Sequence, residues 1–423
     1  MNNLLIKIRF LKLLPLFAGI AITNYSYSKS EKHKKDFTEI NYSKPKGTNY
    51  LNKDSILVFN IDKPGNISDI SLSELGFKDI EYIPLETKKE CLIGNIYKLY
   101  TGTDFYLVHN FGNILKFSSD GTFIAKIGKQ GRGPREFQNA QSVSVNPENG
   151  NIFVLSAWEN KIYIHSPDGK FIKTIPAPSN TTNLICLDNN ILCYSRNQTG
   201  SVENSFDVID YEGKFIKSFP NKYKYQMGKL QAGFMNEFFN FFQNRQLYVK
   251  EFHSDTIFIF RNLNFEPKII LNSGGKRLPP QIRNINYEGE SKTKFKPYLY
   301  DFNLSAAGNY LLNIINYKGE FYRIVANEMN DSRQVRFSNG KLMNDIDGGP
   351  DVDFSSNTDL ACKANENQII RWINAIELKQ YIASNEFKNS TPKYPEKKKA
   401  LEKLANSLNE NDNPVLMLVK LKE

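Results

Sequence analysis

A strand–turn–strand unit that recurs along this 423-residue chain constrains its fold more than any other feature. Each copy has alternating apolar residues, an acidic residue followed by glycine, and a second alternating stretch, and the copies occupy residues 113–128, 161–176 and 206–220. Alternation over short stretches predicts β-strands. A repeat of this kind indicates units that bury their apolar faces against one another.

The turns within the three units share one chemistry. Glycine supplies the positive φ that a tight hairpin needs, and the acidic residue before it caps neighbouring amides. The three turn pairs are Asp120-Gly121, Asp168-Gly169 and Glu212-Gly213. The glycines recur after 48 and 44 residues (121 to 169 to 213), a period that, filled with about four short strands, is typical of a β-propeller blade.

An aromatic residue and an isoleucine follow each turn and point to opposite sides of the strand. In a propeller both sides of such a strand can be buried between packed blades. The pairs are Phe123-Ile124, Phe171-Ile172 and Phe215-Ile216.

Further strand pairs open near residues 237, 301 and 357, which gives six blades and predicts an all-β, six-bladed β-propeller over residues 54–423. Lone strands at residues 77–86 and 414–422 are expected to pair in the last blade and close the ring. A helical insertion is expected at about residues 374–410, because apolar residues recur there at helical spacing. These are Ala400, Leu401, Leu404 and Leu408.

Residues 1–28 read as an export signal, with Lys7, Arg9 and Lys12 ahead of an apolar core at residues 13–22. That core is shorter than the ~20 residues that span a bilayer. No cysteine follows it, so a lipobox is not expected. A buried N-terminal helix and an uncleaved signal are the alternatives. Residues 29–53 form a polar linker, and we expect a periplasmic or cell-surface protein without a transmembrane span after signal removal.

The formal net charge of +10 raises the possibility of nucleic-acid binding, but the basic residues are scattered and no nucleic-acid-binding motif accompanies them. We therefore expect no nucleic-acid partner. The cysteines, Cys91, Cys186, Cys193 and Cys362, form no CxxC pair. Cys186 and Cys193 are either a cross-strand disulfide or two buried thiols.

Four segments together resemble a family of exported six-bladed β-propellers of Gram-negative gut-type bacteria, which is related to NHL-repeat propellers. The segments are residues 80–96, 117–137, 344–351 and 413–421. The resemblance implies a fold and a compartment and no established reaction. Members often carry a lipid-anchor cysteine, which this chain lacks.

Residues 128–137 (GKQGRGPREF) form the most distinctive loop, and we expect ligand contacts at Lys129, Gln130, Arg132, Arg135 and Glu136. Successive amides in a glycine-rich loop can hold an anion. The Gly-Lys-Ser/Thr ending of a Walker loop is missing. The alternative is a blade-to-blade spacer with a salt bridge through Glu136.

Residues 344–353 (NDIDGGPDVD) gather carboxylates, and Asp345 and Asp347 are further ligand-binding candidates. With Asp351 and Asp353 they could hold calcium, but capped turns are the default explanation of these carboxylates. His109, His165 and His253 fall in three blades; zinc would require them to converge, and their positions are not equivalent. No metal ligand is assigned.

The motifs Gly-x-Ser-x-Gly and HExxH are missing from the sequence. We therefore expect a monomeric exported binding module for a glycan, a peptide or an envelope protein, without a catalytic residue. The alternative is a hydrolase or lyase that uses the central channel, with calcium or zinc.

Overall fold

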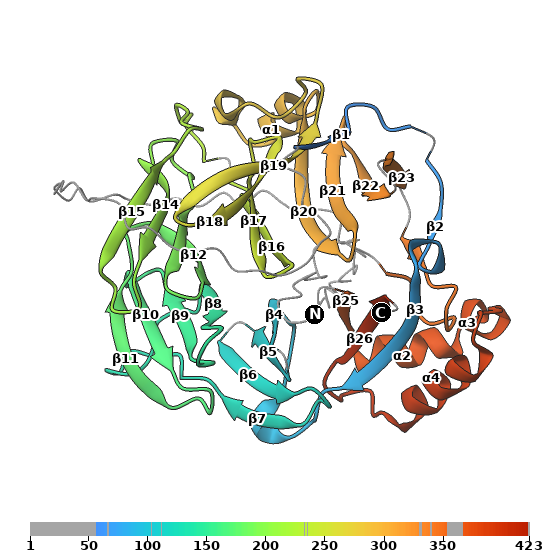
Figure 1. The fold of residues 1–423 in the computed structure, drawn as a ribbon. Helices are drawn as coiled ribbons and strands as arrows, with labels where there is room; N and C mark the ends of the chain where they lie inside the picture. The colour runs from blue at the N-terminus through green and yellow to red at the C-terminus, as the bar shows by residue number, and fades with distance from the viewer. Residues whose placement is uncertain are drawn as a thin grey trace, which may run out of the picture.

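The computed structural model describes residues 56–65, 67–102, 104–110, 112–231, 233–234, 236–329, 332–338, 341–352 and 367–421. Six β-sheets are arranged in a ring around a central axis (Figure 1). The predicted fold class, a six-bladed β-propeller, is confirmed.

The first three blades follow one another along the chain, and each has four antiparallel strands in sequence order. Blade 1 is β4 (Lys98–Thr101), β5 (Phe105–Asn110), β6 (Asn113–Ser118) and β7 (Phe123–Lys126). Blade 2 is β8 (Ser142–Val145), β9 (Ile152–Ser156), β10 (Lys161–His165) and β11 (Phe171–Pro176). Blade 3 is β12 (Thr181–Cys186), β13 (Ile191–Ser195), β14 (Asn204–Ile209) and β15 (Phe215–Pro220).

Blades 4 and 5 each have four consecutive antiparallel strands, and blade 6 combines strands from both ends of the described chain. Blade 4 is β16 (Phe238–Gln243), β17 (Gln246–Glu251), β18 (Thr256–Arg261) and β19 (Asn264–Asn272). Blade 5 is β20 (Leu299–Ala307), β21 (Tyr310–Tyr317), β22 (Glu320–Met329) and β23 (Ser332–Ser338). The described strands of blade 6 are β25 (Gln368–Ile373), β26 (Val415–Leu421) and β3 (Phe77–Pro84).

The three acidic-glycine turns adopt the same conformation, with φ of +87°, +85° and +83° at Gly121, Gly169 and Gly213. A Cβ atom built on Gly169 would lie 2.7 Å from the Lys126 carbonyl oxygen, and one on Gly213 would lie 2.8 Å from Pro176 Cδ. Each turn therefore packs against the outer strand of the preceding blade. Glycine is required at these positions both for its φ and for this close approach.

The Phe-Ile pairs after the turns are only partly buried. Ile124 and Ile172 are 48% and 46% exposed, and Phe215 is 47% exposed. Their partners Phe123 and Phe171 are half-buried. Burial on both sides, which the sequence allowed, is not complete here because these residues lie on outer strands, whose outward side meets solvent.

The ring closes through blade 6, where β26 pairs antiparallel with β3, with Val415 opposite Pro84. Asn413 supports this closure with its side chain. Its Nδ2 donates to the carbonyl oxygens of Glu86 (2.7 Å) and Cys91 (2.9 Å), and its Oδ1 accepts from the Ile93 amide (2.7 Å). Strands from the two ends of the propeller are thus held together.

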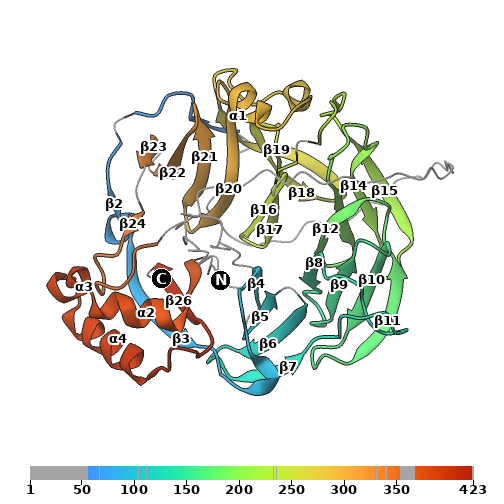
Figure 2. The ribbon, with the colours of Figure 1, turned by 180° about the vertical axis from the view of Figure 1, so that it is seen from behind.

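Residues 57–76, here called the strap, run along the outside of the ring toward β3 (Figures 1 and 2). Strand β1 (Leu57–Asn60) adds to blade 4 parallel to β19. Ile67 forms a parallel bridge to Phe337 of blade 5, and β2 (Ile70–Ser71) pairs with β24 (Leu342–Met343). The strap therefore covers the outer edges of blades 4 and 5.

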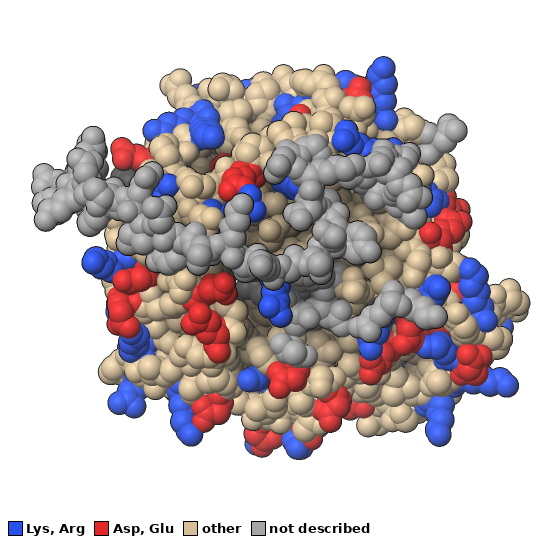
Figure 3. Space-filling model, in the orientation of Figure 1, with Lys and Arg blue, Asp and Glu red and all other residues tan. Residues whose placement is uncertain are grey.

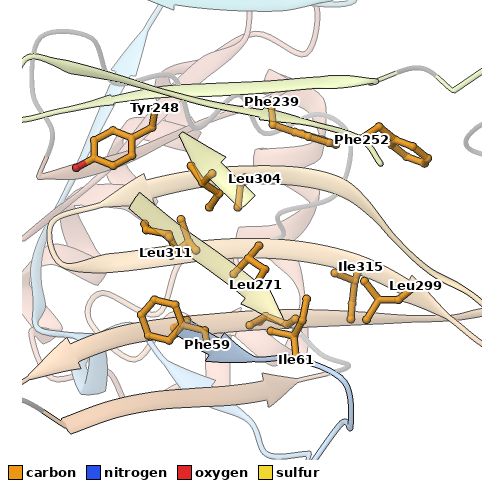
Figure 4. Packing of buried hydrophobic residues seen from close by; sticks show 14 of the residues in the cluster. Phe59, Ile61, Phe239, Tyr248, Phe252, Leu271, Leu299, Leu304, Leu311 and Ile315 are labelled. Atoms are coloured by element: carbon orange, nitrogen blue, oxygen red, sulfur yellow. The ribbon is translucent and has the colours of Figure 1, made fainter. Parts of the chain in front are cut away.

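The largest described core cluster lies between blades 4 and 5 and includes the strap. Phe59 and Ile61 pack near Leu271, Leu299 and Ile315 in that cluster (Figure 4). A second cluster joins blade 6 to three short helices, α2 (Ala375–Ala383), α3 (Asn385–Asn389) and α4 (Pro395–Ser407). The segment expected to be helical at 374–410 thus contains three helices rather than one.

Cys91, Cys186 and Cys193 are buried and form no disulfide, so Cys186 and Cys193 are two buried thiols, as the second alternative expected. Cys362, the signal at residues 1–28 and the linker at residues 29–53 lie outside the described residues. Within the described part of the chain, no helix has the length and apolar character that crossing a bilayer requires.

Candidate ligand-binding site

One face of the ring carries most of the long connections. Neighbouring strands in a blade alternate in direction, so the blade-to-blade connections emerge at the same end as the turns between second and third strands. We call this end the connection face. Its described connections include residues 127–141, 221–237 and 273–298.

The predicted loop at residues 128–137 closes on itself. Gln130 forms a bridge with Phe137, and the Glu136 carboxylate accepts from Lys129 Nζ (2.7 Å) and from the Gly133 amide (2.9 Å). These two bonds lower the pKa of Glu136. The chain's own carboxylate therefore occupies the amide-rich concavity, and the salt bridge considered at Glu136 is present.

The other candidates of this loop are exposed. Gln130 Nε2 donates to the Gln138 carbonyl oxygen (2.9 Å), and the Arg135 guanidinium lies 5.8 Å from the centre of the Phe171 ring. Arg132 is exposed to solvent. A role of this loop in ligand binding stays a prediction.

The carboxylates of residues 344–351 point to different partners. Asp345 accepts from the Ser73 amide (3.0 Å) and pairs with Lys393 (3.2 Å). Asp347 is buried and accepts from Asn344 Nδ2 (2.6 Å) and the Gly349 amide (2.9 Å), as in a capped turn. This loop links the strap to the helices, and it shares no described hydrogen bond with the loop at 128–137. Asp353 lies outside the described residues.

The three histidines lie in blades 1, 2 and 4 and pack against aromatic rings. His109 contacts Tyr97, His165 contacts Phe171, and His253 contacts Phe252. Burial lowers the pKa of His109 and His165 to about 4. In the described ranges, no three His, Cys, Asp or Glu side chains lie close enough together to hold a metal ion.

A different part of the connection face gathers several buried charged side chains. Residues 221–237 lead into blade 4 and residues 273–298 lead out of it, and an antiparallel bridge between Leu230 and Ile285 joins the two connections. We call these two connections the ledge. The second of them carries a 3₁₀ turn (Pro280–Arg283) and helix α1 (Glu290–Phe295), which lie at the top of Figure 1.

Arg283 fixes the two connections of the ledge to each other. Its side chain is fully buried and binds both oxygens of the Glu237 carboxylate, at 2.7 and 3.0 Å. The guanidinium also lies 4.6 Å from the centre of the Tyr225 ring. A bidentate arginine–carboxylate pair of this geometry fixes the orientation of both side chains.

A small polar cavity lies between the ledge and blades 3 and 4. It has room for about one water molecule, about 10 Å³. Its lining includes aromatic, amide and charged side chains from both blades. The residues that line it are Tyr194, Asn197, Ser205, Asn221, Tyr223, Glu237, Glu251, Phe252, His253 and Arg283.

Two acceptors in this cavity have shifted pKa values. Burial raises the pKa of Glu251 to about 7, although a hydrogen bond from Ser205 opposes the shift. Burial also lowers the pKa of His253 to about 3, with Arg283 adding to the effect. Shifted pKa values of this kind gather at functional sites and also in structural ion-pair networks.

Next to the cavity a buried ion network joins blades 4 and 5. Lys250 Nζ lies 2.5 Å from Asp301 Oδ2, and both side chains are fully buried. Arg277 contacts Asp301 (2.6 Å) and Asp255 (2.6 Å). Because each charge has an opposite partner, the network holds the two blades together.

Sequence reasoning noted His253 but missed the ledge and the cavity. The sequence EFHSD at residues 251–255 was a weak signal, since it places two acids around a histidine in a turn. Arg283 and Glu237 belong to no motif, and only folding brings them together.

The ledge also exposes large apolar side chains. Tyr287 is 64% exposed and Met227 is 43% exposed. They lie on the two segments that the Leu230–Ile285 bridge and the contact of Lys229 N with Asn286 Oδ1 (3.3 Å) hold together. Exposed aromatic residues and methionine are common in binding surfaces.

Charges of both signs are interspersed over the described residues visible in Figure 3. This arrangement agrees with the expectation that the net charge of +10 is spread over the surface. Binding to the phosphate backbone of a nucleic acid typically uses a continuous basic stripe. No such stripe is visible among the described residues on that face.

None of the curated proteins matches the chain. Among solved structures, a presumed exported protein of Bacteroides fragilis NCTC 9343 is similar, with a TM-score of 0.62 and 16% identity over 87% of this chain and 100% of that one. A member of the DUF4221 family from Bacteroides vulgatus ATCC 8482 matches with a TM-score of 0.48 and 10% identity, over 82% of this chain and 97% of that one.

The first of these similarities supports the propeller fold, while the relation to NHL repeats stays a prediction. A family model described as a domain of unknown function matches residues 56–420, nearly the whole described propeller. The chain therefore belongs to the DUF4934 family.

Proposed function

We propose that this protein is an exported binding module whose ledge, on the connection face, contacts a glycan, a peptide or an envelope protein. Export to the periplasm or cell surface is supported by the signal-like residues 1–28 and by the presumed export of the similar B. fragilis propeller. Propellers commonly bind ligands through the loops of one face.

One observation carries this proposal: exposed Tyr287 and Met227 project from a ledge that Arg283 holds rigidly. A large aromatic ring offers contact area at a low cost in side-chain entropy. A rigid backbone beneath it lowers the ordering cost of association. The ledge thus combines exposed side chains suited to ligand contact with a preorganised backbone.

The test is a screen of glycan and peptide arrays with the full chain, followed by titration of the best ligand. We expect Tyr287→Ala to weaken its binding about 10-fold or more, the range of a moderate interface hot spot. Ile124→Ala is the matched control, because Ile124 is similarly exposed on the outer strand of blade 1. Equal affinities for the wild type and Tyr287→Ala would contradict the proposal.

A further inference from the structure

The cavity beneath the ledge presents a buried acceptor that has no donor among the described residues. His253 Nδ1 lies 2.7 Å from the Leu278 carbonyl oxygen. A carbonyl oxygen can only accept, so Nδ1 carries the proton and Nε2 is left as an acceptor. This Nε2 atom is buried and has no hydrogen-bond partner among the described residues.

Glu251 supplies the second acceptor, and the nearby cations are already engaged. Arg283 binds both oxygens of Glu237, and Lys250 binds Asp301. Lys222 contributes to the potential at Glu251 but is exposed, so solvent screens its charge. Buried Lys250 favours the ionised carboxylate of Glu251 from a distance, but its direct ion pair is with Asp301.

The two asparagines of the lining do not supply free donors. Asn197 Nδ2 donates to the Tyr223 carbonyl oxygen (2.9 Å). Asn221 Nδ2 donates to the Val202 carbonyl oxygen (3.0 Å). Their amides fix the backbone around the cavity. Ser205 donates to Glu251, and His253 Nε2 has no donor among the described residues.

We propose that this cavity binds a primary ammonium group, either of a free alkylamine or of a lysine side chain. An ammonium has three donors and no acceptor, which complements Glu251 and His253 Nε2. Its size is close to that of the single water molecule for which the cavity has room. The Tyr223 ring, 5.7 Å from the His253 ring, adds an aromatic face that attracts cations.

Binding of an ammonium should depend on pH, because it requires the ionised form of Glu251. With a pKa near 7, this carboxyl group is mostly neutral at pH 6 and mostly ionised at pH 8. The amine stays protonated throughout this range. The charged and titratable groups near Glu251 come from strands β13 and β17, from the β17–β18 turn and from both parts of the ledge. In that order they are Tyr194 and Lys250, then His253 and Asp255, then Lys222, Tyr223, Glu237, Arg277 and Arg283.

Calorimetric titration of the full chain with n-butylammonium and with Nα-acetyl-lysine N-methylamide tests this inference. We expect saturable binding that is several-fold tighter at pH 8 than at pH 6, and no binding of the Nε-acetylated lysine compound. Equal affinity for both amines indicates that the cavity's ligand is a free alkylamine. Tighter binding of the lysine compound indicates that the ligand is a lysine side chain of a peptide. Failure of both amines to bind overturns the proposal.

Two variants complete this experiment. Glu251→Gln preserves the shape of the side chain and should weaken amine binding at pH 8 at least 10-fold, while Glu212→Gln, an exposed acid in a blade 3 turn, should not. Unchanged binding by a folded Glu251→Gln would also overturn the inference. If Glu251→Gln does not fold, the inference is tested on the wild type instead. Its amine binding must then be tighter at pH 8 than at pH 6, and the Nε-acetylated lysine compound must not bind.

The inference rests on the proposed function only in taking the connection face as the ligand-binding face. Tyr287→Ala should leave amine binding unchanged. If the protein binds the amine but Tyr287→Ala leaves binding of the array ligand unchanged, the proposed function alone is refuted. Loss of array binding in Tyr287→Ala, without any amine binding, would refute this inference alone.

Discussion

Single residues of the repeat are under strict backbone constraints. At Gly169, φ is +85° and a Cβ would approach the Lys126 carbonyl oxygen of the preceding blade to 2.7 Å. We expect Gly169→Ala to lower the free energy of unfolding by about 1–3 kcal/mol, since it adds strain at a left-handed position and a steric clash.

Chemical denaturation of Gly169→Ala measures this loss. Gly65→Ala is the control, because a Cβ on Gly65 meets no atom within 4 Å and its φ is not in the left-handed region. Equal unfolding midpoints for Gly169→Ala and the wild type would contradict the packing of the turn against blade 1.

The buried histidines couple stability to pH. Burial lowers the pKa of His165, whose side chain is fully buried, to about 4. The unfolded chain binds the proton near pH 6.5, so the folded state loses stability as pH falls from 6.5 toward 4. For His165 we expect a loss on the order of 2 kcal/mol over this range.

Urea unfolding at pH 7, 6 and 5 tests the histidine prediction. His165→Phe should show a shallower loss of stability with acid than the wild type, whatever its stability at pH 7. An identical slope in both proteins would contradict the prediction, because it would show that His165 binds its proton equally in the folded and unfolded states. Glu251 acts in the opposite direction, because its raised pKa penalises folding as pH rises from about 4.3 to 7.

At the scale of elements, the strap adds a strand to blade 4 and a bridge to blade 5. Phe59 is 3% exposed and packs in the cluster between blades 4 and 5 (Figure 4). We expect Phe59→Ala to cost about 3–5 kcal/mol, the usual range for removing a buried phenylalanine. Thermal or urea unfolding measures it.

Ile56→Ala is the matched control for the strap, because Ile56 lies one residue before β1 and is 40% exposed. It should change stability by less than about 0.5 kcal/mol. Similar stabilities for the two variants would mean that the strap does not hold to blade 4 in solution.

The sequence predicts elements best where they repeat. Gly121, Gly169 and Gly213 mark blades 1–3 because the same turn contacts the same part of each preceding blade. The strap escaped prediction because parallel pairing of β1 with β19 joins segments that are far apart in sequence. The exposure of Ile124 was missed because alternation does not distinguish an outer strand from an inner one.

The candidate site was less predictable than the fold. Lys129 and Glu136 were recognisable because they share one loop, and they satisfy each other there. Arg283 and Glu237 are brought together only by the bridging of two long connections. The pKa of Glu251 depends on burial, which a sequence pattern does not reveal.

At the scale of the whole molecule, the ring has two unlike halves. Blades 1–3 repeat one hairpin and leave their outer strands exposed at Ile124, Ile172 and Phe215. Blades 4–6 lack that repeat and carry the strap, the ledge and the helices. The regular half therefore serves as a scaffold in our account, and the irregular half carries the proposed binding surface.

Hydrogen–deuterium exchange of the full chain, with and without the ligand found on the arrays, tests that account most directly. We predict slower exchange in residues 221–237 and 273–298 when the ligand is bound, and little change in blades 1 and 2. Protection confined to residues 128–137, with the ledge unchanged, would contradict the account and return the site to the glycine-rich loop.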